Sequence, residues 1–182
     1  MRATRITLLA CFLTALMYAV GQALVVPNVE AVTLLAFLSG YLLGPVWGTV
    51  VGGAGMGAHS MFNVMGTVPP PVWIVQVVCY AFIGFCGAWI GPRIPRIEAR
   101  TAQSFAAAGA GIVLTLLYQL AVNVASFTAF ATHVPLWSYV WAGLAFAAVQ
   151  IVWNAALFFV ALPPMLRVFA RVRRELAGKA AA

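Results

Sequence analysis

The sequence predicts an all-α integral membrane protein with six transmembrane helices and with both termini in the cytoplasm. Of its 182 residues, 64% are hydrophobic and only 7% are charged, whereas an average soluble domain has about 25% charged residues. At roughly 20 residues per crossing, this length leaves no room for a separate soluble domain. We therefore expect a single transmembrane domain over residues 1–182, with six apolar segments at about 6–26, 29–44, 46–64, 72–90, 102–131 and 136–162.

The first two segments are bounded by proline. The first ends at Pro27-Asn28, because proline cannot continue a helix. Its apolar run ahead of Cys11 is shorter than the core of a signal peptide, so we expect this segment to be retained as a helix. The second segment is short, about 24 Å at the helical rise, and Gly44-Pro45 predicts a turn after it.

The third segment is rich in glycine. Gly44, Gly48 and Gly52 recur every four residues, and Gly53 and Gly57 have the same spacing. Small residues at this spacing let helix backbones approach closely in lipid, so tight packing is their expected role. A second interpretation is that this helix moves or lines a cavity.

Prolines and glycines also delimit the later segments. Three consecutive prolines in the stretch 66–71 predict a stiff, polyproline-like loop ahead of the fourth segment. Gly91-Pro92 follows that segment and ends it. After the fifth and sixth segments, Pro163-Pro164 predict the end of the last helix.

The basic residues are gathered at three places, which six crossings would put on one side of the membrane. They lie at the N-terminus, between the fourth and fifth segments, and in the C-terminal tail. The loops predicted on the other side, 27–30, 63–71 and 132–135, contain no lysine or arginine. Cytoplasmic loops of membrane proteins carry an excess of these residues. The cytoplasmic side is therefore expected to hold Arg2, Arg5, Arg93, Arg96, Arg100, Arg167, Arg171, Arg173, Arg174 and Lys179.

Several functions lack their usual residues here. No phosphate-binding loop of the Gly-x-x-x-x-Gly-Lys-Ser/Thr type is present, and the sole lysine is Lys179. The cysteines Cys11, Cys79 and Cys86 lie in apolar runs without the spacing of metal ligands, so we interpret them as small packing residues. The net charge of +7 follows the topology and does not indicate nucleic-acid binding. We expect neither an enzyme nor a cofactor or metal.

The informative side chains are polar residues within apolar helices. Such groups are costly in lipid unless they pair or face a cavity. Four pairs are spaced i,i+4 and so share a helical face, which hydrogen bonds between helices would explain as well as a ligand would. These pairs are His59 and Asn63, Gln76 and Tyr80, Gln119 and Asn123, and Gln150 and Asn154.

Depth in the membrane separates these residues. Gln150 falls near the middle and Asn154 lower, so we interpret both as contacts between helices. Aromatic side chains in the outer half fit an interfacial belt, yet aromatic rings among amides, one histidine and one carboxylate also suit a heteroaromatic ligand. Glu30 could pair with a cationic or amine-bearing ligand, be a solvated loop carboxylate, or be a charge at the N-terminus of a helix. The predicted substrate-binding set is Asn28, Glu30, His59, Asn63, Trp73, Gln76, Tyr80, Asn123 and Trp141.

Three stretches of the sequence resemble the substrate-binding S components of energy-coupling factor (ECF) transporters. They are Pro27-Asn28-Val29-Glu30-Ala31-Val32-Thr33, the stretch 40–48 with its Gly44-Pro45-x-x-Gly48 turn, and Asn63 with the proline-rich loop that follows. The size, the six segments and the cytoplasmic ends are also similar to that family, so the resemblance covers nearly the whole chain.

This resemblance implies a function and partners. ECF transporters import vitamins and related micronutrients into prokaryotic cells, so the resemblance implies a multi-pass protein of the cell (inner) membrane. The S component binds its substrate near the outer face, while a transmembrane T subunit and two cytoplasmic ATPase subunits supply the energy, and the whole S component topples to carry its ligand inward. Small residues spaced four apart on the first helix contact the T subunit in the family. Ala15 and Ala19 match that spacing here.

Two other classes of protein remain open. A membrane scaffold, such as a rod-shape-determining-type cell-shape or assembly protein, would also be small, helical and non-catalytic. It would lack the cavity of roughly 300 Å³ or more that a small ligand needs. A stand-alone secondary transporter would favour broken helices and internal repeats, and no convincing repeat relates the two halves of this sequence.

Overall fold

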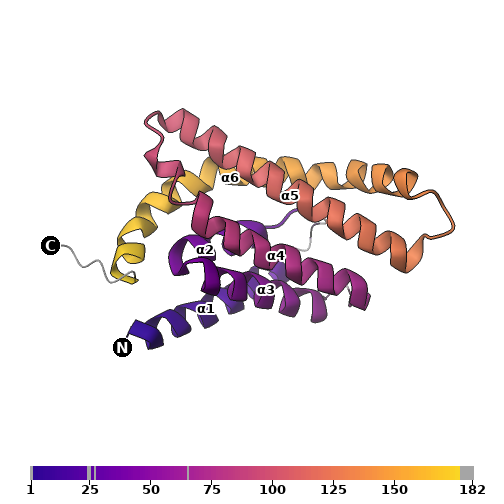
Figure 1. The fold of residues 1–182 in the computed structure, drawn as a ribbon, viewed down its shortest axis with the longest axis horizontal. Helices are drawn as coiled ribbons and strands as arrows, with labels where there is room; N and C mark the ends of the chain where they lie inside the picture. The colour runs from indigo at the N-terminus through magenta and orange to yellow at the C-terminus, as the bar shows by residue number, and fades with distance from the viewer. Residues whose placement is uncertain (1, 24–25, 27, 65, 177–182) are drawn as a thin grey trace.

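The computed structural model describes residues 2–23, 26, 28–64 and 66–176. These residues form helices that alternate in direction. Both described ends of the chain lie at one end of the bundle, together with the connection from α4 to α5 (Figure 1). The helices are α1 (Arg2–Ala23), α2 (Val32–Leu43), α3 (Pro45–Met61), α4 (Pro70–Ile90), the 3-10 helix η1 (Ile94–Arg96), α5 (Arg100–Phe130) and α6 (Leu136–Leu176).

Four of these helices, α1, α4, α5 and α6, are long and apolar enough to cross a membrane. The bundle also exposes large apolar side chains, among them Phe12, Phe82, Val113 and Val152, on surfaces that suit contact with lipid. This is the architecture of a multi-pass, all-helical membrane protein. The 12 residues of α2 and the 17 residues of α3 span about 18 and 26 Å. Six full crossings therefore stay a prediction.

Glycines bring α2, α3 and α4 into backbone contact. A methyl group at Gly84 of α4 would lie 2.0 Å from the carbonyl oxygen of Gly48, and one at Gly40 of α2 would lie 1.8 Å from that of Gly84. A methyl group at Gly52 would lie 2.2 Å from the carbonyl oxygen of Tyr80. The predicted packing role of Gly48 and Gly52 is thus confirmed. Gly44 instead has a φ of 87° and makes the turn between α2 and α3.

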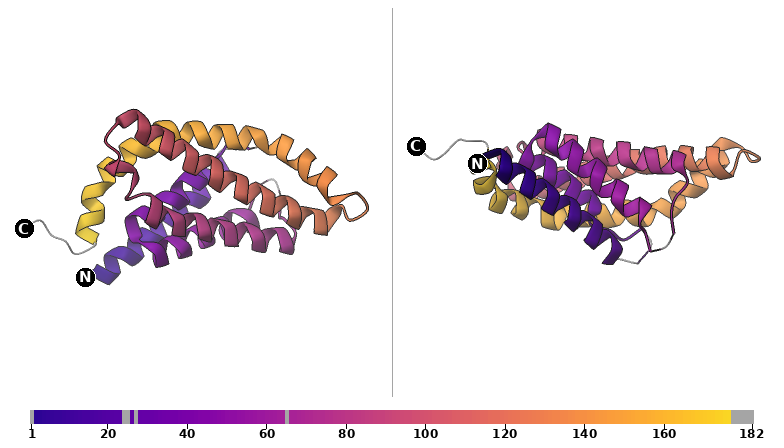
Figure 2. Two further views of the ribbon diagram at one scale, coloured as in Figure 1. Left: turned by 45° about the horizontal axis from the view of Figure 1, so that its top comes forward. Right: turned by 90° about the horizontal axis from the view of Figure 1, so that it is seen from below.

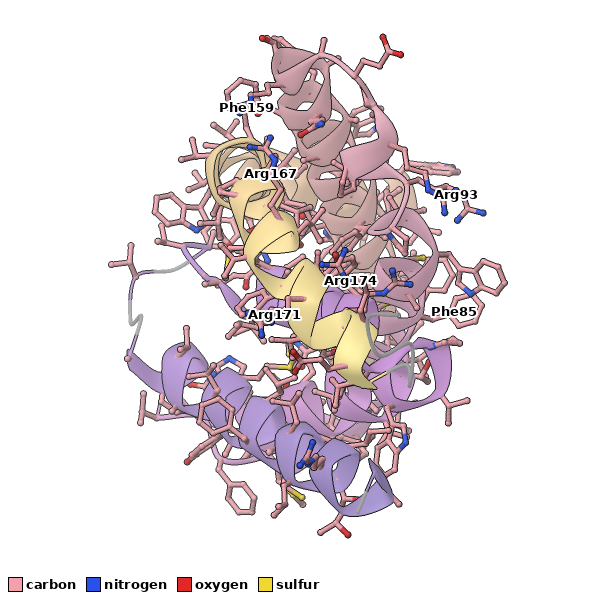
Figure 3. The ribbon with its side chains drawn as sticks, turned by 90° about the vertical axis from the view of Figure 1, so that its left-hand side faces the viewer. Phe85, Arg93, Phe159, Arg167, Arg171 and Arg174 are labelled. Carbon is pink, nitrogen blue, oxygen red and sulfur yellow. The ribbon has the colours of Figure 1, made fainter. Side chains whose placement is uncertain are left out.

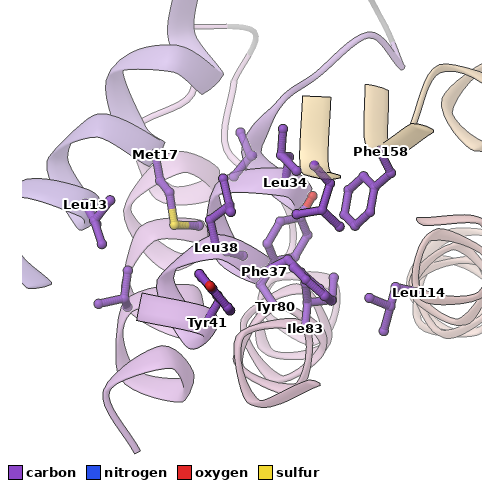
Figure 4. Packing of buried hydrophobic residues seen from close by; sticks show 14 of the residues in the cluster. Leu13, Met17, Leu34, Phe37, Leu38, Tyr41, Tyr80, Ile83, Leu114 and Phe158 are labelled. Atoms are coloured by element: carbon purple, nitrogen blue, oxygen red, sulfur yellow. The ribbon is translucent and has the colours of Figure 1, made fainter. Parts of the chain in front are cut away.

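The apolar core is centred on α2. Phe37 and Leu38 of α2 lie between Met17 of α1 on one side and Phe158 of α6 on the other (Figure 4). Phe37 and Phe158 meet edge to face, with ring centroids 5.5 Å apart, a favourable geometry for aromatic pairs. Because α2 is so short, its first turn is held inside the bundle, and this determines where the site is built.

Helix α1 lies on the outside of the bundle (Figure 2). Its Leu13 and Met17 are buried, and Met17 packs against Gly55 of α3, where a methyl group would lie 2.8 Å from the methionine sulfur. Ala15 and Ala19 are exposed on another side of the helix. The small residues that the sequence analysis assigned to a partner are therefore accessible.

The predicted end of the sixth helix at residue 162 is wrong. Helix α6 continues through Pro163 and Pro164 to Leu176. Its C-terminal part, yellow in Figure 1, bends away from the direction of the earlier, orange part of the same helix. Two prolines remove two backbone donors and bend a helix without necessarily ending it. Burial of Leu166 and the 2.8 Å hydrogen bond from the Tyr41 hydroxyl to the Leu166 carbonyl hold the continuation in place.

The predicted starts of α4 and α2 also differ from the structure. Pro70 and Pro71 belong to α4, not to the preceding loop, because proline is well suited to the first positions of a helix, where backbone N–H groups have no helical partner. Pro69 alone keeps the polyproline-like geometry, with φ −58° and ψ 149°. Helix α2 begins at Val32 and not near residue 29, which leaves Glu30 outside the helix.

Candidate ligand-binding site

Glu30 caps the buried first turn of α2. Its Oε2 accepts a 2.8 Å hydrogen bond from the backbone N–H of Thr33, and its Oε1 accepts a 2.5 Å hydrogen bond from the Thr33 hydroxyl. The first N–H groups of a helix have no partner within it, and a carboxylate there also interacts favourably with the helix dipole. Just before it, Asn28 has a φ of 63°, the left-handed conformation that asparagine tolerates better than most residues.

Helix α6 surrounds the same carboxylate with amides. Asn154 Nδ2 donates to Glu30 Oε1 at 2.7 Å and Gln150 Nε2 donates to it at 3.2 Å. The indole of Trp153 donates to the backbone carbonyl of Glu30 at 2.7 Å. Three side chains within about one turn of α6 thus tie the segment before α2 to the middle of that helix.

Both amides also connect α6 to α5, as the sequence analysis expected. Asn154 Nδ2 lies 3.0 Å from the Thr115 hydroxyl, and Gln119 donates a hydrogen bond to Gln150. Their contact with Glu30 was not expected, because the predicted topology placed Glu30 near the outer end of the bundle, Gln150 near the middle and Asn154 lower.

Two tyrosines extend this network. The hydroxyl of Tyr80 on α4 lies 3.0 Å from the Thr33 hydroxyl, and the ring of Tyr80 meets that of Tyr118 on α5 edge to face at 5.2 Å. Gln76 Nε2 donates to the Tyr118 hydroxyl at 3.3 Å. Both tyrosines and Gln76 are buried, and these hydrogen bonds hold the two hydroxyls in place. The Oε1 of Gln76 is buried without a hydrogen-bond partner among the described residues.

A cavity of about 320 Å³ adjoins Glu30 and the two tyrosines. On its other side lies the end of α3, where His59 Nδ1 is 3.5 Å from Gln22 Nε2 of α1 and His59 Nε2 is 3.4 Å from Asn63 Nδ2. We call this space the Glu30 cavity. Its polar lining residues are Gln22, Asn28, Glu30, His59, Asn63, Tyr80, Tyr118 and Gln150.

A second cavity, of about 480 Å³, lies between α5 and α6. Asn28, Tyr118 and Gln150 line both cavities, so the two adjoin each other. Asn28 Nδ2 donates a 3.1 Å hydrogen bond to the Phe146 carbonyl of α6 at this boundary. The polar residues that line only the second cavity are Gln119, Asn123, Ser126 and Tyr139.

The structure brings most of the predicted substrate-binding residues to these cavities. Asn123 lines the second cavity, and Gln76 lies behind Tyr118 and holds it. The predicted residues on the Glu30 cavity are Asn28, Glu30, His59, Asn63 and Tyr80.

The two predicted tryptophans lie elsewhere. Trp73 donates from its indole to the Gly57 carbonyl and lines a groove between α3 and α4. Trp141 is 70% exposed and is not among the lining residues of either cavity. It precedes Gln150 by nine positions, or about two and a half helical turns. The two side chains therefore point to opposite sides of α6.

Sequence reasoning missed three lining residues, Gln22, Tyr118 and Gln150. Tyr118 and Gln22 could have been identified from the sequence as polar residues in apolar helices. Such a group needs a partner whether or not it belongs to an i,i+4 pair. Gln150 was recognised as polar and buried but was assigned to packing alone.

Comparisons of the chain with models of protein families, with curated proteins and with solved structures gave no match. The chemistry of the site is that of recognition: hydrogen-bonding groups and aromatic rings converge on a cavity large enough for a small molecule.

Proposed function

We propose that the chain is the substrate-binding S component of an ECF-type importer and that it binds a vitamin-like micronutrient in the Glu30 cavity. The observation that carries this proposal is the cavity itself, where polar side chains from α1, α3, α4, α5 and α6 and from the segment before α2 converge inside an otherwise apolar bundle. Polar groups within apolar helices are expensive and commonly mark a substrate site.

The cavity favours ligand binding over a scaffold. Its volume of about 320 Å³ falls in the range of small-molecule sites, and the second cavity beside it offers further room. A scaffold that only packs against partners needs no such space. Glu30, Tyr80 and His59 all line this cavity. Their carboxylate, hydroxyl and imidazole suit a compact polar or heteroaromatic molecule.

The distribution of charge supports an orientation with the cavity toward the outside. Arginines surround the end of the bundle that holds both described chain ends, which Figure 3 views directly and where Arg93, Arg167, Arg171 and Arg174 are labelled. The end of α3 and the loop between α5 and α6 lie toward the opposite end (Figure 1). The excess of basic residues on cytoplasmic surfaces assigns the arginine-rich end to the cytoplasm.

A T subunit and two cytoplasmic ATPase subunits would power the import. The exposed side of α1, which carries Ala15 and Ala19, is the proposed contact with the T subunit, because small side chains allow a second helix to approach closely in lipid. The weak attachment of α1, with few buried residues, leaves most of its surface for such a partner.

Mass spectrometry of the small molecules carried by the purified protein tests the proposed function. We expect a bound micronutrient in the wild-type protein and its loss when Asn63 and Asn123 are both replaced by alanine. Trp141→Ala is the matched control and should retain the molecule, since its side chain faces away. Equal recovery from the double variant would contradict the placement, and purification without any ATPase partner would contradict the transporter role.

A further inference from the structure

The Glu30 cavity carries a net negative charge. Glu30 is the sole lining residue with a carboxylate, and no lysine or arginine lines the cavity. All ten basic residues of the chain lie at positions 2–5, 93–100 and 167–179, away from the lining positions. Within the described part of the chain the carboxylate therefore has no cationic partner, and the salt bridge recorded there joins Arg171 to Glu175 on α6.

Neutral donors hold the carboxylate without cancelling its charge. The four hydrogen bonds on its two oxygens come from the Thr33 N–H and hydroxyl and from the amides of Gln150 and Asn154. A carboxylate is an acceptor-only group, and Glu30 is the acceptor in every one of these bonds. Hydroxyls and amides are dipoles of zero net charge, so the cavity keeps one negative charge.

The carboxylate also keeps room for another donor. Oε1 accepts from three partners, whereas Oε2 accepts from the Thr33 N–H alone among the described residues. Each carboxylate oxygen has about two lone-pair positions. A further donor can therefore bond to Oε2 without displacing any of the bonds that hold Glu30.

We infer that the ligand is an organic cation that places a protonated amine or amidine against Glu30. This inference rests on the proposed function only in taking the cavity to be the binding site of a small molecule. A partly buried charge is costly without a partner, and a cationic ligand supplies the missing charge. An anionic ligand would meet the carboxylate with like charge, which costs affinity and excludes carboxylate-bearing molecules.

The aromatic lining suits the rest of such a ligand. Tyr80 and Tyr118 both line the cavity, and aromatic rings attract cations as well as flat heterocycles. His59 also lines the cavity and could itself carry a positive charge. The test is therefore run near pH 8, where imidazole groups are largely neutral.

The test uses three probes of nearly equal shape and different charge: benzamidinium, benzamide and benzoate. Binding to the full-length protein in detergent or nanodiscs is measured by calorimetry and by the shift in the thermal unfolding midpoint. We expect benzamidinium to bind at least roughly tenfold more tightly than benzamide, and benzoate not to bind. Equal binding of benzoate and benzamidinium, or no binding of benzamidinium at millimolar concentration, would overturn the inference.

Two variants separate charge from packing. Glu30→Gln keeps the size of the side chain and should abolish the preference for benzamidinium over benzamide, while Glu30→Asp keeps the charge and should retain a preference. Glu98→Gln, an exposed position at the arginine-rich end, removes the same charge and should leave the preference intact. A preference that survives in Glu30→Gln would contradict the inference, and the three probes on the wild-type protein decide it should that variant fail to fold.

The outcomes also separate this inference from the proposed function. The probes need no T subunit or ATPase, so their binding is measured independently of the importer. Charge selectivity in a protein that purifies from its cells without any ATPase partner would keep the cationic ligand and reject the importer. An importer complex that carries an anionic micronutrient would support the importer and overturn the cationic ligand.

Discussion

Asn154 of α6 donates a 2.7 Å hydrogen bond to Glu30, a residue 124 positions earlier in the chain. The same amide nitrogen lies 3.0 Å from the Thr115 hydroxyl of α5, and the side chain of Asn154 is fully buried. One amide thus joins the segment before α2 to the two longest helices. This junction determines both the position of the carboxylate and the shape of the cavity beside it.

Replacement of Asn154 by alanine should destabilise the protein. The change removes a donor from the buried Thr115 hydroxyl and another from the partly buried Glu30 carboxylate. A buried polar group left without its partner costs about 1–3 kcal/mol. A clear fall in the thermal unfolding midpoint in detergent is the expected result. Val152→Ala is the control, because Val152 is on the same helix but exposed. Similar midpoints for the two variants would show that the junction contributes nothing.

Gly84→Ala should prevent α3 and α4 from packing at their observed distance. The added methyl group would lie 2.0 Å from the Gly48 carbonyl oxygen, a contact that only a backbone shift can relieve. Overpacking of this kind typically costs about 1–3 kcal/mol. Gly109→Ala on α5 is the matched control, since a methyl group there has no neighbour within 4 Å. We expect a lower yield of monodisperse protein for Gly84→Ala and a normal yield for Gly109→Ala.

Asn28 combines a left-handed backbone with a hydrogen bond to α6, and two substitutions separate these roles. Asn28→Gly keeps the conformation and loses the bond to the Phe146 carbonyl, whereas Asn28→Ala loses the bond and adds strain of roughly 1–2 kcal/mol. Faster amide hydrogen exchange around residues 28–33 is expected in both variants, with a lower unfolding midpoint for alanine than for glycine. If the Asn28→Ala variant proved as stable as the Asn28→Gly variant, the left-handed conformation at residue 28 would not be strained.

The predicted orientation can be tested by cysteine labelling in intact cells. After replacement of Cys11, Cys79 and Cys86, single cysteines are introduced at His133 and at Glu98, both of which are exposed. A membrane-impermeant maleimide should label position 133 from outside and reach position 98 only after lysis, because the arginines beside Glu98 favour the cytoplasm. Labelling of both positions in intact cells would refute the orientation.

The apolar segments and the glycine spacing were enough to predict the six α-helices of the described part of the chain and, except for the end of α6, their approximate bounds. They were also enough to predict close packing at Gly48 and Gly52, because both depend on local chain properties: hydrophobic length, helix breakers and side-chain size. The polar residues Glu30, His59, Asn63 and Tyr80 were identified for the same reason, since each stands out against an apolar background.

The tertiary structure decided which of those residues meet. Helix α2 is short, so Glu30 lies within the bundle and reaches Gln150 and Asn154, whose burial looked like simple packing from the sequence. Trp141 faces outward because its rotation around α6 is opposite to that of Gln150, and α6 passes Pro163 and Pro164 because packing around Leu166 supports it. The depth of Glu30, the side of α6 that Trp141 faces and the packing around Leu166 all depend on contacts between helices that are distant in the chain. Local sequence patterns do not specify those contacts.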